Sequence, residues 1–148
     1  MESTLATSHD ADLILKLYDL RREAVMRRAR HWVTTEFFPQ SAAEALAPVQ
    51  AWGTEQNAWL RQVISYWEMA AAFVMHGALN GDVFLDCNGE PFFIYAKFQP
   101  FLAEIRAVQP SFLMTLEQVI AQYPAARQRV EMMVKQLEKR RAAAVAKG

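Results

Sequence analysis

The stretch TEQNAWLRQVISYWEMAAAFVMHG, residues 54–77, decides the fold of this chain. Its apolar residues recur at the spacing of an α-helix and cover nearly the whole circumference. A helix of that kind needs other helices around it, so we predict a buried central helix over about residues 54–77. Thr54 or Gly53 marks its start, and Gly77 marks its end. Two apolar ridges run along it: Trp59, Val63, Tyr66, Ala70, Phe73 and Gly77, and Leu60, Ile64, Trp67, Ala71 and Met75.

Two further helices are predicted before the central one. Asp10 can cap a first helix that runs to about Phe38, and Pro39 ends it. Ser41 is followed three residues later by Glu44, which is the capping-box pattern and predicts a short helix from the next residue onward.

Two helices are also predicted near the end of the chain. Ser111 can cap one of them, and Pro124 starts the last one or kinks into it. Few glycines and prolines interrupt the chain, and 53% of its 148 residues are hydrophobic. We therefore predict an all-α, single-domain bundle of about six helices over residues 8–148, preceded by a disordered tail over residues 1–7.

The segment GDVFLDCNGEPFFIY, residues 81–95, allows two interpretations. Asn88 and Gly89 between apolar flanks are typical of a two-residue β-hairpin turn. The flanks are continuous rather than alternating, however, and Pro91 suits the first turn of a helix. We favour a short helix from Gly81 to about Cys87, a turn, and a second helix.

Composition excludes a general attraction to polyanions, because sixteen Lys and Arg residues balance sixteen Asp and Glu residues. Cys87 is the single cysteine, so no internal disulfide forms and a reducing compartment is indicated. The N-terminus lacks the pattern of a signal peptide, and no apolar run is long enough to span a membrane. We expect a soluble, cytoplasmic protein.

Glu68 is the one carboxylate within the apolar run of the central helix. Burying it in charged form is costly, so it must be paired, protonated or turned toward a polar cavity. One interpretation is a structural ion pair or hydrogen-bonded network with Arg106 or Arg61. Another is a carboxyl group of raised pKa in a ligand pocket, and the third is simple exposure at the edge of the helix.

The residues that could complete such a pocket are Tyr66, His76 and Arg106. His76 lies eight residues after Glu68, about 12 Å along a helix axis, so the two cannot chelate one ion. His76 also suits a helix C-terminus, where an imidazole interacts favourably with the last carbonyl groups. The three histidines are too scattered to predict a metal site, and neither a cofactor motif nor a catalytic constellation is present.

Arginines are frequent in the first predicted helix, where Arg21 and Arg28 would share a face. A stripe of arginines along one face of a helix could contact phosphates of nucleic acid. Acidic residues at helical spacing, such as Glu23 with Arg27, instead indicate ion pairs on a solvated face, which makes nucleic acid an unlikely partner.

The central segment also carries a recurring set of residues over about residues 55–108. An aromatic pair and a glutamate come before a glycine. After the glycine come an acidic residue at the start of a helix and then a segment with aromatic residues and a proline, which ends in arginine. With this set the chain resembles an uncharacterised bacterial family of all-helical domains of unknown function. The resemblance implies an all-helical fold and no particular activity. The residues are Tyr66, Trp67, Glu68, Gly77, Gly81, Asp82, Tyr95, Pro100, Phe101 and Arg106.

These patterns favour a non-enzymatic module that binds a protein partner and self-associates as a homo-oligomer. The alternative is a small-molecule or enzymatic pocket centred on Glu68, and nucleic-acid binding through the first helix ranks third.

Overall fold

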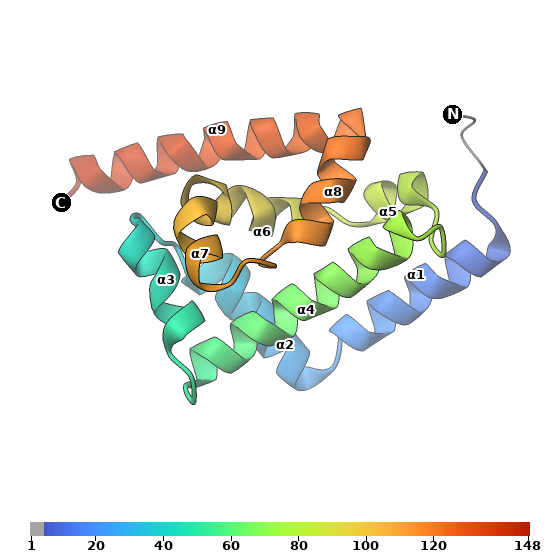
Figure 1. Cartoon of the computed structure of the whole chain (residues 1–148), viewed down its shortest axis with the longest axis horizontal. Coiled ribbons are helices and arrows are strands. Elements are labelled where there is room, and N and C mark those ends of the chain that lie inside the picture. Colours follow the sequence, from blue (N-terminus) through green and yellow to red (C-terminus); the bar gives the residue numbers. More distant parts are fainter. Residues whose placement is uncertain (1–4) are drawn as a thin grey trace.

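The computed structural model describes residues 5–148, and these residues form helices and no strand. Helix α4 crosses the middle of the molecule, and α9 lies along one side of it (Figure 1). In chain order the helices are α1 (Ser8–Arg21), α2 (Ala24–His31), the π-helix η1 (Trp32–Glu36), α3 (Ala42–Gln50), α4 (Glu55–Met75), α5 (Gly81–Cys87), α6 (Glu90–Phe98), the 3-10 helix η2 (Gln99–Phe101), α7 (Leu102–Val108), α8 (Met114–Gln122) and α9 (Pro124–Ala146).

The predicted all-α bundle is confirmed, but it contains more helices than six. The expected first helix is broken after Arg22, because the side chain of Glu23 accepts the backbone N–H groups of Val25 and Met26 and so starts α2. The predicted N-cap was also wrong, since Thr7 caps α1.

Asp10 instead completes the capping box of α1, with its carboxylate accepting the N–H of Thr7 at 2.7 Å. The same carboxylate accepts the N–H of Asn80 at 2.9 Å, which ties the start of α1 to the start of α5.

The central helix is where the sequence places it. Thr54 caps α4, and Gly77 follows its end with a φ of 76°, a conformation that glycine adopts without strain. Trp67, near its midpoint, is 1% exposed and stacks edge-on against Phe84 of α5. Helices α2, α3 and α8 pack around α4, which therefore forms the centre of the bundle.

Residues 81–87 and 90–98 are helical, so the favoured interpretation of two helices with a turn between them is confirmed and the hairpin alternative was wrong. Asn80 caps α5 by accepting the N–H of Val83 at 2.9 Å, and Pro91 lies in the first turn of α6, where its missing N–H costs nothing. The chain turns between the two helices at Asn88 and Gly89.

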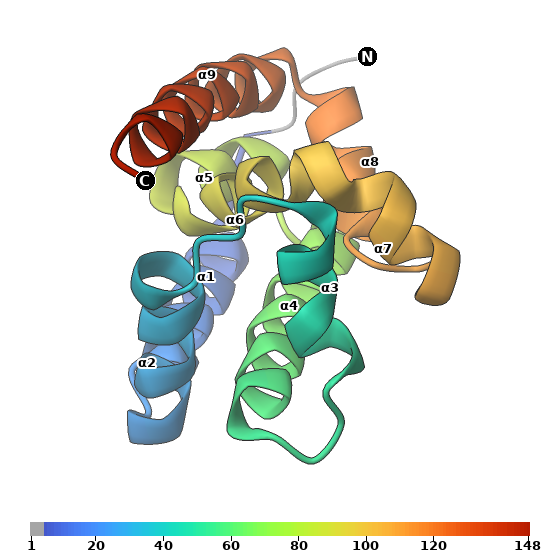
Figure 2. The same cartoon turned by 90° about the vertical axis from the view of Figure 1, so that its left-hand side faces the viewer.

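Helix α9 lies across α6 and against α8, far from α1 and α2 (Figure 2). Arg141 fixes its C-terminal half by donating to the carbonyl oxygens of Lys97 at 2.9 Å and Pro39 at 3.2 Å. The guanidinium group of Arg140 lies 4.0 Å from the ring centre of Phe38. Basic residues of this helix are thus used in packing.

Part of the predicted N-terminal tail, residues 1–4, lies outside the described residues. Residues 5–7 precede the first helix and are exposed, and disorder of the tail stays a prediction. Within residues 5–148, no helix combines the length and apolar character that crossing a membrane requires.

Candidate functional site

Glu68 lies against the N-terminus of α8. Its two carboxylate oxygens accept the backbone N–H groups of Thr115 at 3.2 Å and Leu116 at 2.7 Å. The first N–H groups of a helix have no partner within it and usually bind a nearby capping side chain. Here the residue before α8 is Leu113, which has a left-handed φ of 56° and no capping group. Glu68 therefore supplies the cap from a different helix, and the predicted cap at Ser111 was wrong.

Opposing effects act on the carboxyl group of Glu68. Burial raises its pKa, while the N–H groups of Leu116 and Thr115 and the nearby positive charge of Arg106 act to lower it, and the net direction is upward. The group is half-buried, so one part of it faces solvent.

Arg106 is not bonded to Glu68, contrary to the ion pair that we considered. Its guanidinium group pairs with Glu117 of α8 at 2.9 Å and donates to the carbonyl oxygen of Phe112 at 2.9 Å. Tyr95 donates its hydroxyl proton to the same Glu117 carboxylate at 2.7 Å. Arg106 thus links α7 to α8 and reaches Glu68 only through its charge.

Tyr66 and His76 lie away from Glu68. The hydroxyl group of Tyr66 donates to the carbonyl oxygen of Leu17 on α1, and burial raises its pKa to about 12. His76 is the exposed C-terminal cap residue of α4, and its backbone N–H donates to the carbonyl oxygen of Ala72 at 2.9 Å. The structure therefore brings together Glu68 and, at longer range, Arg106.

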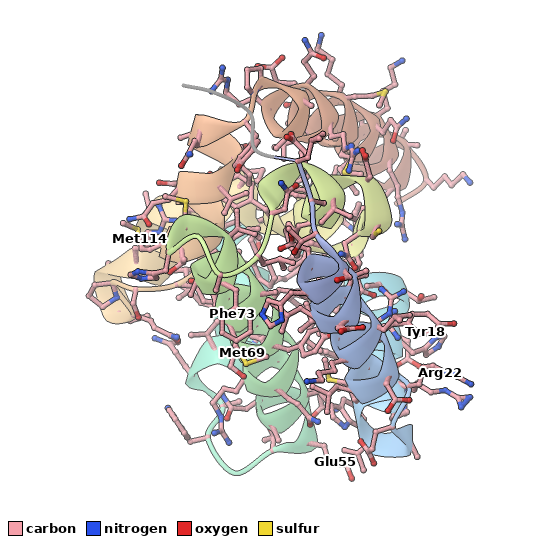
Figure 3. All side chains as sticks on the ribbon, turned by 90° about the vertical axis from the view of Figure 1, so that its right-hand side faces the viewer. Tyr18, Arg22, Glu55, Met69, Phe73 and Met114 are labelled. Carbon is pink, nitrogen blue, oxygen red and sulfur yellow. The ribbon has the colours of Figure 1, made fainter. Side chains whose placement is uncertain are left out.

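A cleft of about 630 Å³ opens beside Glu68, between α4, the end of α3 and the loop from α7 to α8. Met114 at the start of α8 lines the cleft. It lies on the same side of the molecule as Met69 and Phe73 of α4, which are not part of the lining (Figure 3). The apolar lining of the cleft consists of Val49, Trp52, Ala58, Leu60, Ile64, Phe112 and Met114, and the polar lining of Asn57, Arg61, Gln62, Ser65, Glu68, Gln109, Ser111 and Thr115.

The second charged group in this lining is Arg61. Its guanidinium group lies 4.7 Å from the ring centre of Trp52, and its Nε donates to the side-chain oxygen of Asn57 at 2.9 Å. Asn57 is itself 1% exposed and donates to the carbonyl oxygens of Pro48 and Val49, at the end of α3. This chain of contacts holds Arg61 against an indole ring at one end of the cleft.

The two arginines considered for nucleic acid do not form one stripe, because they lie on separate helices. Arg21 ends α1 and lies 4.9 Å from the ring centre of Tyr18. Arg28 of α2 pairs with Glu36 at 3.0 Å and lies 4.6 Å from the ring centre of Trp59. These positive charges are engaged within the protein.

One buried cation escaped the sequence analysis. Lys97 of α6 is 0% exposed, and its Nζ donates to the carbonyl oxygens of Val33, Thr34 and Phe37 at 2.7, 3.2 and 2.7 Å. It caps the C-terminal end of η1, and burial lowers its pKa to about 8. The signal that singled out Glu68, a lone charge in an apolar run, is also present around Lys97.

A second polar cluster, also missed, joins three helices. Arg30 of α2 binds both carboxylate oxygens of Glu90 on α6, at 2.9 and 3.2 Å, and the indole N–H of Trp67 donates to the same carboxylate at 2.9 Å. None of these three side chains lines the cleft, and we assign the cluster to packing.

Comparison with known proteins places the chain in a family. Residues 6–123 match the family described as Domain of unknown function (DUF4760), a match that includes every residue of the cleft lining. No curated protein and no solved structure matches the chain. The resemblance seen over residues 55–108 is thereby confirmed and extended in both directions, while a bacterial origin stays a prediction. The chain belongs to the DUF4760 family of uncharacterised domains.

Proposed function

We propose that this protein binds a small organic molecule in the cleft beside Glu68. The volume of about 630 Å³ lies within the range of roughly 300–1,000 Å³ that is usual for ligand sites. The lining combines apolar and polar side chains, and hydrogen bonds hold Asn57, Arg61 and Glu68 in place, as the orienting groups of ligand sites are held.

The observation that carries this proposal is the way in which Glu68 is held. The two N–H groups of α8 orient the carboxylate without a cationic side chain bonded to it. Each carboxylate oxygen offers about two lone-pair sites, and one backbone N–H occupies only one of them. Glu68 therefore retains acceptor capacity for a donor group on a ligand.

A fragment screen by two-dimensional NMR tests the proposal. We expect some fragments to shift the amide signals of residues 57–68 and 109–115 together, because residues of both segments line the cleft. A variant that fills the cleft, Ser65→Trp, should lose this binding. The matched control Gln136→Trp, at an exposed position of α9, should keep it. Fragments that bind both variants equally, or none that shift these segments, would contradict the proposal.

Self-association is the second candidate function, and exposed apolar side chains on the outer side of α1 and α2 favour it. Leu15, Leu20 and Val25 are 63%, 57% and 55% exposed. Tyr18 of α1 and Arg22, the residue after this helix, project away from α4 (Figure 3). Burying these exposed apolar side chains against a second copy would be favourable.

Light scattering at increasing concentration tests this candidate. The wild-type protein should form a dimer that Leu15→Glu dissociates, whereas Gln136→Glu should not affect it. A monomer at all concentrations would exclude it.

A further inference from the structure

Resting on the proposed function, we infer that the ligand of the cleft is a short peptide with free ends, about three residues long. Its ammonium group is bound by Glu68 and its carboxylate group by Arg61. The inference follows from the sign, spacing and surroundings of the two charged groups in the lining.

Arg61 is suited to bind a carboxylate. Its Nε is taken by Asn57, and the outer edge of the guanidinium group remains for two parallel hydrogen bonds to a planar anion. The guanidinium carbon lies 4.7 Å from the ring centre of the exposed Trp52, so the indole and Asn57 together restrict the orientation of the guanidinium group. Because the Arg61 side chain is already restricted before a ligand binds, less conformational entropy is lost on binding.

Glu68 is suited to bind an ammonium group. It is the acidic residue of the cleft lining, and it is half-buried, so an ion pair there is screened less than one on the open surface. The N–H groups of Thr115 and Leu116 fix both of its oxygens in place. A ligand cation would therefore meet an acceptor that is already oriented.

The spacing of the two groups sets the length of the ligand. Arg61 and Glu68 are seven residues apart on α4, so their Cα atoms lie within about 20° on the same face of the helix and about 10 Å apart along its axis. An extended chain rises about 3.3–3.6 Å per residue, and three residues therefore span about 10 Å. A single amino acid is too short to reach both groups.

The lining of the cleft favours a peptide over a simple alkyl chain of the same length. Ser65 lies on α4 between the two charges, and Gln109 and Ser111 lie in the α7–α8 loop. These side chains can donate to and accept from peptide groups. Phe112 and Met114 add apolar surface for a ligand side chain.

Calorimetric titration with the tripeptide Ala-Phe-Ala tests the inference. We expect N-acetylation or C-amidation of this peptide to weaken binding on the order of tenfold each, a loss of about 1.4 kcal/mol. The ω-aminooctanoate ion, which has similar end spacing but no peptide groups, should also bind on the order of tenfold more weakly.

Two variants assign each end of the peptide. Glu68→Gln should abolish the difference between the free and acetylated peptides, and Arg61→Gln should abolish the difference between the free and amidated ones. The control Glu131→Gln, an exposed charge on α9, should keep both differences. Thermal unfolding of each variant shows whether it is folded.

The outcomes separate this inference from the proposed function. If the free and capped peptides bind equally, or if ω-aminooctanoate binds as tightly as the tripeptide, the inference is wrong. It is also wrong if no peptide binds while other fragments shift the signals of the cleft. If no fragment and no peptide reaches the cleft, the proposed function fails as well.

Discussion

The carboxylate of Glu68 on α4 accepts the backbone N–H of Leu116 on α8 at 2.7 Å, so one helix caps another across 48 residues of sequence. Loss of a capping side chain usually costs about 0.5–2 kcal/mol. Glu68→Ala should therefore lower the free energy of unfolding by about 1 kcal/mol relative to Glu68→Gln, which keeps one acceptor oxygen and avoids burying a charge. Urea unfolding at neutral pH measures the difference, and equal stability of the two variants would show that the contact does not cap α8.

Lys97 should make stability depend on pH above about pH 8. Its pKa is lowered from 10.5 to about 8 in the folded protein. Between these values the unfolded chain holds the proton and the folded chain has released it, so the unfolded state binds more protons and stability rises with pH. The slope reaches at most about 1.4 kcal/mol per pH unit.

The stability difference between wild type and Lys97→Met, measured by urea unfolding from pH 7 to 9.5, isolates this effect. The free energy of unfolding of the wild type should increase relative to that of Lys97→Met as the pH rises. Tyr66, whose raised pKa makes the folded state hold an extra proton above about pH 10, is present in both proteins and cancels from this difference. A difference that stays constant with pH would mean that Lys97 titrates normally.

Gly81 and Gly89 should respond oppositely to alanine. A Cβ atom at Gly81 would lie 2.0 Å from the hydroxyl oxygen of Tyr123, whereas one at Gly89 meets nothing within 4 Å. Overpacking of this kind typically costs about 1–3 kcal/mol, so Gly81→Ala should destabilise by that amount. Gly89→Ala should be neutral or stabilising by up to about 1 kcal/mol.

A double-mutant cycle identifies the cause of the loss at Gly81. In a Tyr123→Ala background, Gly81→Ala should cost far less, since the side chain that it strikes is gone. Thermal unfolding of the four proteins checks this. Additive effects would show that the loss at Gly81 does not arise from contact with Tyr123.

Two glutamates in ion pairs should differ in their contribution to stability. Glu90 and its partner Arg30 have side chains 14% and 23% exposed, whereas Glu36 and Arg28 are 42% and 47% exposed. Glu90→Gln should therefore cost about 1–3 kcal/mol, because it weakens a largely buried group that binds two partners. Glu36→Gln should cost at most about 0.5 kcal/mol. Equal losses in chemical denaturation would contradict the assignment of the Glu90 cluster to packing.

The sequence predicts the centre of the fold well because one periodic pattern determines it. Most of the two apolar ridges in residues 54–77 is buried, and a local cap and a glycine define the ends of α4. The break between α1 and α2 could not be predicted in the same way. Apolar periodicity continues across it, and Glu23 is not among the residues that usually cap helices.

The site was predictable only in part. A carboxylate in an apolar helix showed that Glu68 needs a partner, but the partner is a pair of backbone N–H groups near residue 115. Backbone groups carry no sequence signature, so local patterns pointed to arginines. Lys97 illustrates the same limit, since its three acceptors are carbonyl groups some 60 positions earlier in the chain.

The most direct test of the central claim observes the amide signals of Thr115 and Leu116 during titration with Ala-Phe-Ala. Both N–H groups donate to Glu68, so a ligand that binds this carboxylate must change their chemical shifts. We predict saturable shifts of both signals in the wild-type protein, and, with the fold retained, smaller shifts that need about tenfold more peptide in Glu68→Gln. Shifts that are absent from these two amides, or unchanged in Glu68→Gln, would contradict a ligand site at Glu68.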